Sequence, residues 1–354
     1  MTDTLRLANG LVCPAPPAPA ERIQLGHGSG GKLSAALLRE RFLPHLANPV
    51  LQQLGDAAVV PVFGGEIAFS TDTFVVSPLE FPGGNIGSLA VHGTLNDVAM
   101  MGAVPRFLSA GFVIEEGLEF AVLDRVIAAM AAAARAAGVP LITGDTKVVE
   151  RGKADGLYIN TTGIGTLDGA CRPAPERAAS GDAVIVSGPI ACHGMAIMAA
   201  REGLGFEAEI ESDSAALYPL VARMAERFGA DVHVLRDPTR GGVASALNEI
   251  AAASGTGMVL DEEALPIPGP VSAACEMLGL DPLYVANEGV MLAILPERLA
   301  DAAVEALRAE PLGAEAVRIG RVVADHPGMV VMRTAMGGTR VVDMLPGDQL
   351  PRIC

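Results

Sequence analysis

Residues 88–102 read SLAVHGTLNDVAMMG, and this stretch is the main evidence for the fold expected of the first half of the chain. Its apolar residues recur at helical spacing, so it predicts a helix with an apolar face. A second, alanine-rich helix is predicted at 120–137. The predicted strands around these helices are AVVPVF (58–63), EIAFS (66–70), RFLSAGFVI (106–114), VPLIT (139–143) and GLYINTTGIG (156–165). Strands interleaved with helices in this way predict a mixed sheet with helices on one face.

A break rich in proline and glycine, CRPAPERAASGD (171–182), separates this half from a second set of elements. That set comprises helices at 195–201 and 241–253, the strands 183–187, 257–260 and 290–295, and a terminal strand meander at 317–323, 329–332 and 339–344. We therefore expect an α/β (α+β) protein with two domains, 23–170 and 171–345. Residues 1–22 are expected to be a flexible proline-rich extension, and 346–354 a flexible tail that packs against nothing.

The composition excludes several classes of function. The net charge is −16 and no cluster of Lys and Arg is present, so nucleic acid is not an expected partner. The five cysteines form no C-x-x-C pair, which argues against a disulfide framework and a structural zinc site. The N-terminus lacks an export signal and no uninterrupted apolar run approaches ~20 residues, so we predict a cytoplasmic protein without a membrane span.

Four aspartates share one kind of setting, at the edge of an apolar element. They are Asp56, Asp72, Asp97 and Asp145. Carboxylates at such positions can converge on a Mg²⁺ ion that bridges phosphates. Aspartate also caps helices and punctuates turns, which is the alternative for any single one of them. Taken together, the four favour a magnesium–nucleotide site.

The glycine-rich segment GHGSGGKL (26–33) nearly matches the P-loop pattern. Leu33 stands where a P-loop needs Ser or Thr for Mg²⁺, and no buried strand precedes the segment, so we reject a P-loop NTPase. A glycine loop can still wrap phosphates with its amides, although a flexible joint explains these glycines equally well. The candidate phosphate contacts are Gly28, Ser29, Gly30, Gly31 and Lys32.

Two residues are candidates for proton transfer. Lysine occurs only at positions 32, 147 and 153, and unlike arginine it can lose a proton when partly buried. Lys147 follows Asp145 by two residues, so it is a candidate phosphate contact or proton-transfer group, or else half of a surface ion pair. Glu288 directly precedes a predicted buried strand, where it is either a general base with a raised pKa or a turn residue.

The segment RDPTRGGVASALNEIA (236–251) places polar residues and two glycines before a predicted helix. Amides at the helix start, together with Arg240, suit an anion. The alternative is a tight turn in which Asp237 or Thr239 caps the helix.

Cys354 is the last residue. A terminal thiol is sterically free to enter an active site, accept a group and carry it. A cysteine without any role at the end of the chain is the alternative.

The chain resembles the HypE family, the carbamoyl dehydratases of hydrogenase maturation. The motifs that carry the resemblance are HGSGGK (27–32), GDAAV (55–59), TDTFVVSPLEFPGGNIG (71–87), NDVAMMGAVPR (96–106), TGDTKVVERG (143–152), RDPTRGG (236–242), ANEG (286–289) and the terminal PRIC (351–354). The resemblance runs from about Ile23 to Cys354. More distantly, the chain is similar to the aminoimidazole ribonucleotide synthetase (PurM-like) superfamily, which includes selenophosphate synthetase and thiamine-phosphate kinase.

The resemblance implies a two-domain fold in which the N-terminal domains of a homodimer join strands. It implies ATP and Mg²⁺ in a cleft near that interface, with the four aspartates around the metal and phosphates. The further residues that we expect to bind the nucleotide are Asn96, Asp97, Thr146 and Arg240.

The resemblance also implies an activity. HypF transfers a carbamoyl group to the terminal cysteine, ATP activates the carboxamide oxygen, and elimination leaves a thiocyanate on the sulfur of Cys354. Lys147 and Glu288 are the candidates for removing the amide protons, with interchangeable roles. The cyanide then passes to iron held by the HypC–HypD complex.

The chain departs from the family pattern at ACHGM (191–195), where an acidic residue is expected before His193. Two other functions compete with the dehydratase: a small-molecule kinase or selenophosphate synthetase of the same superfamily, and a scaffold that binds nucleotide without catalysis. Neither uses the thiol of Cys354 in a reaction, so deletion of that residue separates them from a dehydratase.

Overall fold

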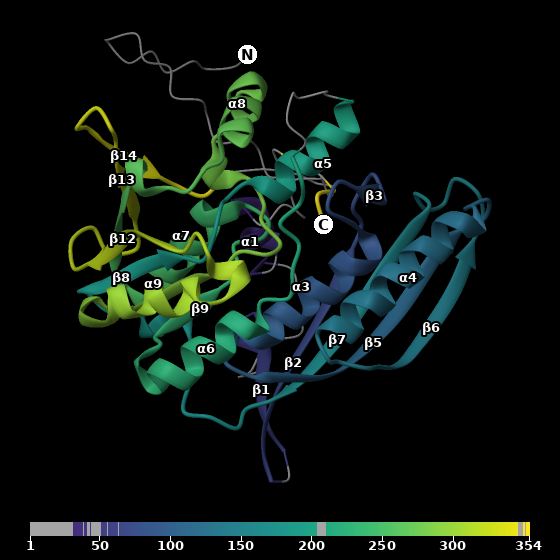
Figure 1. The fold of residues 1–354 in the computed structure, drawn as a ribbon, viewed down its shortest axis with the longest axis horizontal. Coiled ribbons are helices and arrows are strands. Elements are labelled where there is room, and N and C mark those ends of the chain that lie inside the picture. Colours follow the sequence, from purple (N-terminus) through teal and green to yellow (C-terminus); the bar gives the residue numbers. More distant parts are fainter. Residues whose placement is uncertain are drawn as a thin grey trace.

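Two β-sheets organise the chain, one in each half of the sequence, and their domains lie side by side (Figure 1). The predicted boundary at 170/171 lies between the last strand of the first sheet and the first strand of the second. The computed structural model describes residues 31–37, 39–40, 43, 51–54, 56–62, 64–203, 210–345, 350 and 352–354.

The first sheet has the strand order β1-β2-β7-β5-β6. Its strands are β1 (Ala58–Val62), β2 (Gly65–Phe74), β5 (Val104–Glu115), β6 (Leu141–Val149) and β7 (Leu157–Thr166). Only β5 and β6 pair in parallel within this sheet, so the predicted mixed sheet is confirmed. Helices α3 (Ile86–Met100) and α4 (Phe120–Ala136) cover one face, as expected (Figure 1). The short strands β3 (Glu80–Phe81) and β4 (Gly84–Asn85) form a separate hairpin before α3.

Helix α3 begins at a capping box that the sequence encodes locally. The side-chain oxygen of Asn85 accepts hydrogen bonds from the amides of Gly87 at 2.9 Å and Ser88 at 3.2 Å. The Ser88 hydroxyl lies 3.2 Å from the Asn85 amide and accepts from it. A Cβ on Gly87 would lie 2.2 Å from the carbonyl oxygen of Val126, so glycine lets α3 and α4 approach closely. The helix is therefore fixed at its start and packed on nearly every side.

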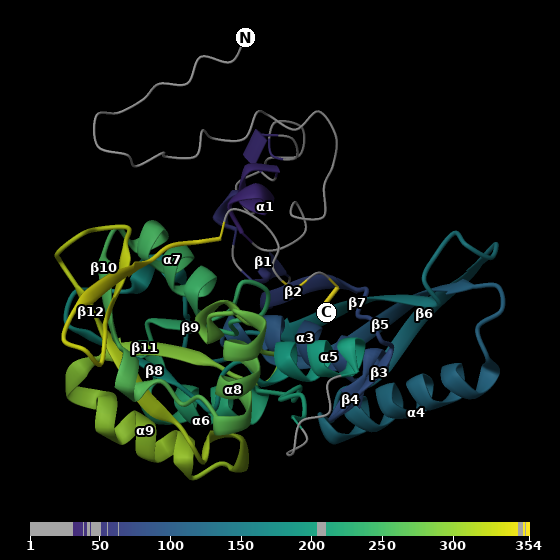
Figure 2. The same cartoon turned by 90° about the horizontal axis from the view of Figure 1, so that it is seen from above.

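The second sheet has the strand order β14-β13-β10-β12-β8-β11-β9. Its strands are β8 (Asp182–Val186), β9 (Val234–Arg236), β10 (Gly257–Asp261), β11 (Leu292–Pro296), β12 (Val317–Val323), β13 (Val330–Arg333) and β14 (Thr339–Val342). Helix α7 (Gly242–Ser254) lies on one face, and α6 (Tyr218–Phe228) and α9 (Ala300–Arg308) lie on the other (Figure 2). The predicted terminal meander is wrong, because β10 inserts between β12 and β13 and pairs with both.

The remaining helices are α1 (Lys32–Leu37), α5 (Cys192–Glu202) and α8 (Gly269–Leu278). Short 3₁₀ helices are η3 (Leu51–Gln53), η4 (Pro175–Arg177), η5 (Gly229–Asp231), η6 (Glu262–Ala264), η7 (Pro282–Tyr284), η8 (Glu297–Leu299) and η9 (Pro311–Gly313). The sequence did not predict α6, α8, α9 or β9. Across the described ranges, no helix combines the length and the apolar character that a membrane crossing needs.

The C-terminus lies beside α5, at the border between the two domains (Figures 1 and 2). The amide of Val75 donates to the Cys354 carbonyl at 3.1 Å, and the amide of Ser77 donates to the Arg352 carbonyl at 3.2 Å. Ile353 is 2 % exposed and belongs to the core cluster of the first domain. The expectation that the tail packs against nothing is therefore wrong for residues 352–354, because hydrogen bonds and one apolar side chain hold them in place.

Candidate active site

Three carboxylates converge where the two domains meet. Asp56 precedes β1, Asp97 lies on α3, and Asp237 follows β9 of the second domain. One side-chain oxygen from each lies within 4.8 Å of the others. We call these three residues the acid cluster. Because its members come from both domains, packing of the domains creates the site.

One arginine and one serine contact the acid cluster directly. Arg236 pairs with Asp56 at 2.6 Å and with Glu249 at 2.6 Å. The hydroxyl of Ser70, on β2, donates to Asp97 at 2.7 Å. These contacts orient the acids but offset only part of their charge.

Burial raises the pKa values of all three acids, and neighbouring acids raise those of Asp97 and Asp237 further. Burial is the main cause for Asp97, whose pKa rises well above its ordinary value, and Asp237 adds to the effect. The pKa of Asp237 rises to about 7, first through burial and then through Asp56. The pKa of Asp56 also rises through burial, although Arg236 opposes the shift. Oxygen ligands that repel one another in a desolvated site fit a hard divalent cation such as Mg²⁺.

Asp72 and Arg240 extend the site from the acid cluster. Burial raises the pKa of Asp72, and the nearby charge of Arg240 lowers it. Asp72 in turn raises the pKa of Asp97. The structure therefore brings Asp56, Asp72 and Asp97 together as the sequence predicted, with Arg240 beside them.

Glu288 lies in a buried loop of the second domain and is 2 % exposed. A carboxylate oxygen of Asp213 holds this loop, because it accepts from the amides of Glu288 at 2.9 Å and Gly289 at 2.7 Å. Burial, followed by Asp237 and Asp72, raises the pKa of Glu288 well above its ordinary value. Its environment is thus that of a candidate base and not that of an exposed turn residue.

The thiol of Cys354 reaches this site. It is hydrogen-bonded to the Glu288 side chain, and the charges of Arg240 and Asp72 act on it. Burial raises the pKa of the thiol, so the sulfur is protonated at neutral pH. The chain end therefore places its sulfur beside Glu288, one of the two candidates for proton transfer.

Asn96 has a different role from the predicted nucleotide contact. Its amide nitrogen donates to the carbonyls of Ala215 at 3.0 Å and Glu288 at 3.4 Å. Its oxygen accepts from the amide of Leu217 at 2.8 Å, and the residue is 1 % exposed. Both N–H groups are thus engaged with the second domain, so Asn96 joins the domains where we had expected it to bind ATP.

Asp145, Thr146 and Lys147 do not join the acid cluster within one chain. They lie on the edge strand β6, with β7 and β5 between them and Asp72 on β2. Three strand spacings separate Asp145 from Asp72 by about 14 Å. Lys147 forms an exposed ion pair with Asp145, and the Asp145 carboxylate accepts from the Thr146 amide at 2.8 Å. Within one chain, Asp145 therefore lies apart from Asp56, Asp72 and Asp97.

The glycine-rich segment is described only from Gly31 onward, so the predicted contacts Gly28, Ser29 and Gly30 lie outside the described residues. Gly31 accepts from the amide of Ala35 in the first turn of α1. Lys32 pairs with Asp343, and its amide donates to the carbonyl of Leu345 at 3.0 Å. In this structure Lys32 therefore contacts the segment that leads into the tail.

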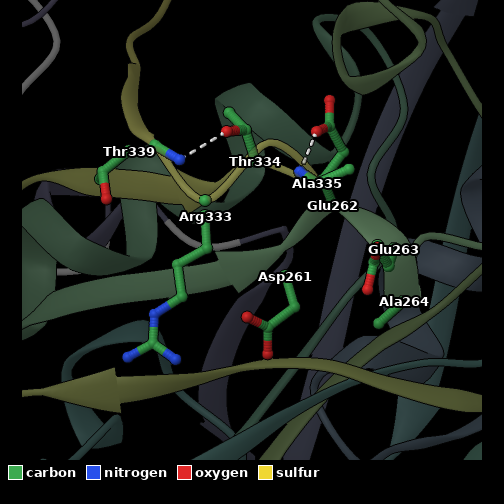
Figure 3. A pocket seen from close by; sticks show the side chains of 10 residues that line it. Asp261, Glu262, Glu263, Ala264, Arg333, Thr334, Ala335 and Thr339 are labelled. Carbon is green, nitrogen blue, oxygen red and sulfur yellow. Dashed lines mark hydrogen bonds between the residues drawn. The ribbon is translucent and has the colours of Figure 1, made fainter.

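A surface pocket of about 570 Å³ lies elsewhere, against the β13–β14 hairpin (Figure 3). Asp261, Glu262, Glu263 and Arg333 line it, and Glu262 accepts from the Ala335 amide at 2.8 Å. No predicted site residue lines this pocket. It is therefore separate from the acid cluster.

Sequence reasoning missed three residues of the site. Asp237 was taken only as a possible helix cap, although its place in RDPTRGG beside Arg240 was a usable signal. Asp213 holds the Glu288 loop, and His193 lies 2.9 Å from the Ile353 carbonyl through Nε2. Asp213 had no signal in the sequence. The family pattern marks the turn at His193 but not its contact with Ile353, which only folding creates.

Comparison with known proteins agrees with this geometry. The chain matches the AIR synthase related protein N-terminal domain over 54–167 and the C-terminal domain over 179–332. It is 54% identical to carbamoyl dehydratase HypE of Azotobacter vinelandii, over 94% of this chain and 97% of the relative. The chain belongs to the carbamoyl dehydratase HypE family. It is accordingly an enzyme of the PurM-like superfamily.

Other members of the HypE family give the same result. The Escherichia coli carbamoyl dehydratase HypE is 44% identical over 94% of this chain and 99% of the relative. A solved structure of HypE in complex with ATP has a TM-score of 0.80 and 51% identity, covering 93% of this chain and 98% of that one. A HypE–HypF complex has a TM-score of 0.83 and 44% identity, covering 88% and 100%. The two-domain fold of the family is thus the fold of this chain.

Proposed function

We propose that this chain catalyses the ATP-dependent dehydration of its own S-carbamoylated Cys354 to a thiocyanate. The observation that carries the proposal is the Cys354 thiol, which is hydrogen-bonded to Glu288 beside Arg240 and Asp72. A carbamoyl group on this sulfur lies among the buried acids without further movement of the tail. The thiocyanate supplies the cyanide ligand of a nickel–iron hydrogenase.

The acid cluster and Arg240 prepare the site for ATP, which one solved relative binds. Asp56, Asp97 and Asp237 would hold Mg²⁺, because their oxygens converge and a divalent cation relieves their repulsion. Magnesium-bound ATP supplies a phosphoryl group that converts the carboxamide oxygen into a leaving group. Arg240 stabilises negative charge that develops beside the sulfur, and burial excludes competing water.

Glu288 accepts an amide proton in this scheme. Its raised pKa makes the ionised side chain a stronger base than an exposed glutamate. Its interaction with the Cys354 thiol places Glu288 beside the sulfur that carries the carbamoyl group. Asp213 keeps the base in position through the two backbone amides.

The carbamoyl group is loaded elsewhere. Burial raises the pKa of the Cys354 thiol, and a protonated thiol is a poor nucleophile. The tail must therefore leave the site to accept the group, and we assign the transfer to HypF, with which one solved relative forms a complex. We assign receipt of the cyanide to the HypC–HypD complex. We also assign these steps to the cytoplasm, where thiols stay reduced.

Lys147 requires a second copy of the chain. Strand β6 is exposed along almost its whole length, with Ile142 59% and Val148 68% exposed. Phe69 and Phe107 are also exposed, on the sheet face opposite α3 and α4. An open sheet edge and an uncovered apolar face support the homodimer in which N-terminal domains join strands. In that dimer, Asp145, Thr146 and Lys147 of one chain complete the site of its partner.

Intact-protein mass spectrometry after carbamoylation of Cys354, with and without Mg-ATP, tests the function. Loss of one water from the C-terminal peptide, dependent on ATP, is the expected result. A carbamoyl adduct that survives ATP turnover unchanged would leave the small-molecule kinase as the better account. Deletion of Cys354 supplies the control, because a kinase keeps its activity without this residue.

A further inference from the structure

Main-chain hydrogen bonds hold the last three residues of the chain against the segment that follows β2. Residues 75–77, directly after β2, donate amides to the carbonyls of Cys354 at 3.1 Å and Arg352 at 3.2 Å. The Nε of Arg352 donates back to the Val75 carbonyl at 3.1 Å. Hydrogen bonds to the main chain recognise a bound peptide largely independently of its side chains.

Two side chains of α5 complete this recognition of the main chain. His193 lies 2.9 Å from the Ile353 carbonyl through Nε2 and 2.7 Å from the Ser212 hydroxyl through Nδ1. Since a carbonyl can only accept, Nε2 carries the proton and Nδ1 accepts from the hydroxyl. Arg201 donates to the Arg352 carbonyl at 2.8 Å and to the Ser77 carbonyl at 2.7 Å. All three carbonyls of residues 352–354 are therefore bound.

One side chain gives the site its sequence preference. Ile353 is 2 % exposed and belongs to an apolar cluster that includes Ile197 and Ala286. A slip of one residue would replace Ile353 in this cluster by Arg352 or Cys354, neither of which is a large apolar side chain. The same slip would move the sulfur of Cys354 away from Glu288. The buried isoleucine thus sets the register of the reacting atom.

We propose that residues 75–77, His193 and Arg201 form a peptide-binding groove that accepts a separate C-terminal peptide, with an apolar residue before its S-carbamoyl cysteine, as a substrate in trans. The contacts that hold residues 352–354 are non-covalent. They involve the main chain, the buried side chain of Ile353 and the side chain of Arg352, which pairs with Asp155. The inference rests on the proposed dehydratase function. It goes beyond that function because it assigns the substrate class to a groove and not to the covalent tail.

The peptide undergoes the same dehydration as the tail, with the same fate for each atom. The carboxamide oxygen leaves carbon as part of inorganic phosphate after accepting the γ-phosphoryl group of ATP. The two amide hydrogens leave as protons, one of which stays on the phosphate, and a C≡N bond forms on the sulfur. The products are the peptide thiocyanate, ADP and phosphate.

The test uses a full-length double variant, designed so that its own tail leaves the groove. Ile353→Asp places a carboxylate where an apolar side chain is buried, and Cys354→Ser removes the internal acceptor. The probe is the S-carbamoylated peptide acetyl-Leu-Pro-Arg-Ile-Cys at about 10 mM, because a tethered tail has an effective concentration in the millimolar range. Mass spectrometry of the peptide should show loss of one water, dependent on Mg-ATP.

Two controls define specificity. The same peptide with Asp in place of Ile should react at least about tenfold more slowly, because its side chain cannot enter the apolar cluster. The single variant Cys354→Ser keeps its native tail and its fold, so its peptide turnover should be lower but should rise with peptide concentration. Absence of peptide turnover in both variants overturns the inference, as does equal turnover of the two peptides.

The native chain separates failure of the groove from failure of the function. If carbamoylated Cys354 loses water in cis but neither variant converts the peptide, the function stands and the groove does not accept a separate substrate. If the native chain also fails, the proposed function is wrong.

A matched histidine pair tests the positioning role of the groove. His193→Ala should raise the KM for the peptide, because it removes the donor to the penultimate carbonyl. His92→Ala should leave that KM unchanged, since His92 contacts Ser214 at 3.0 Å and not residues 352–354. Equal effects of the two substitutions would contradict the assignment of His193.

Discussion

The acid cluster and the Asp145–Lys147 pair use similar side chains in two regions that differ in burial. Burial and neighbouring acids raise the pKa of Asp97, whereas a hydrogen bond from Lys147 is the main cause that lowers the pKa of Asp145. Asp97 lies between two domains, and Asp145 lies on the open edge of one sheet. The difference teaches that packing of the domains, and not the local motif, converts a carboxylate into one that needs a divalent cation.

The largest expected effect is at the residue that the second domain adds to the acid cluster. Asp237→Asn removes a charged oxygen ligand, so single-turnover thiocyanate formation should fall by about 100-fold and require more Mg²⁺. Quenched-flow mass spectrometry over a magnesium titration measures both changes. Asp261→Asn, in the acidic pocket of Figure 3, is the matched control and should leave the rate unchanged.

Mixing two inactive variants tests the role of the Asp145–Lys147 pair. Lys147→Ala keeps its carrier cysteine, and Cys354→Ala keeps its lysine, so a dimer of the two has one complete site if Lys147 acts across the interface. After random subunit exchange, roughly half of the chains that carry Cys354 should regain thiocyanate formation. No recovery in a verified mixed dimer would place Lys147 in the site of its own chain.

Without magnesium, the acid cluster should make the free energy of unfolding depend on pH. The raised pKa of Asp237 means that the folded state binds a proton more tightly than the unfolded state. Its contribution is therefore fully present below the ordinary Asp value and is lost as pH rises through about 7. Between pH 5 and 7, the free energy of unfolding of the native chain should fall relative to Asp237→Asn by up to about 1 kcal/mol per pH unit. Urea titrations of both chains without divalent ions measure the difference, and parallel pH profiles would contradict the pKa of Asp237.

The smallest effect is expected at the exposed pair. Asp145→Asn should leave the melting temperature of the isolated chain unchanged, because water screens the partner charge of Lys147. Differential scanning calorimetry checks this, with Asp237→Asn as the reference that should shift. A fall in melting temperature as large as that of Asp237→Asn would erase the distinction between the two regions.

Sequence periodicity predicted the mixed first sheet and its two helices because those signals are local. Residues 88–102 carry a helical pattern, and α3 occupies Ile86–Met100. The order of the second sheet was not predictable, because the insertion of β10 between β12 and β13 leaves no trace in either strand.

The residues of the site were likewise predictable only where their signal is local. Asp56, Asp72 and Asp97 were predictable because each stands at the edge of an apolar element. Asp237 was missed since a cap and a metal ligand look alike in sequence. The bound tail was missed because one isoleucine, Ile353, gives no hydrophobic pattern, and its carbonyl partners come from segments more than a hundred residues away.

The position of Cys354 also protects it chemically. Alkylating agents and peroxides attack the thiolate, and a desolvated thiol with a raised pKa provides very little of it. While the tail lies beside Glu288, the carrier sulfur is therefore shielded from irreversible oxidation.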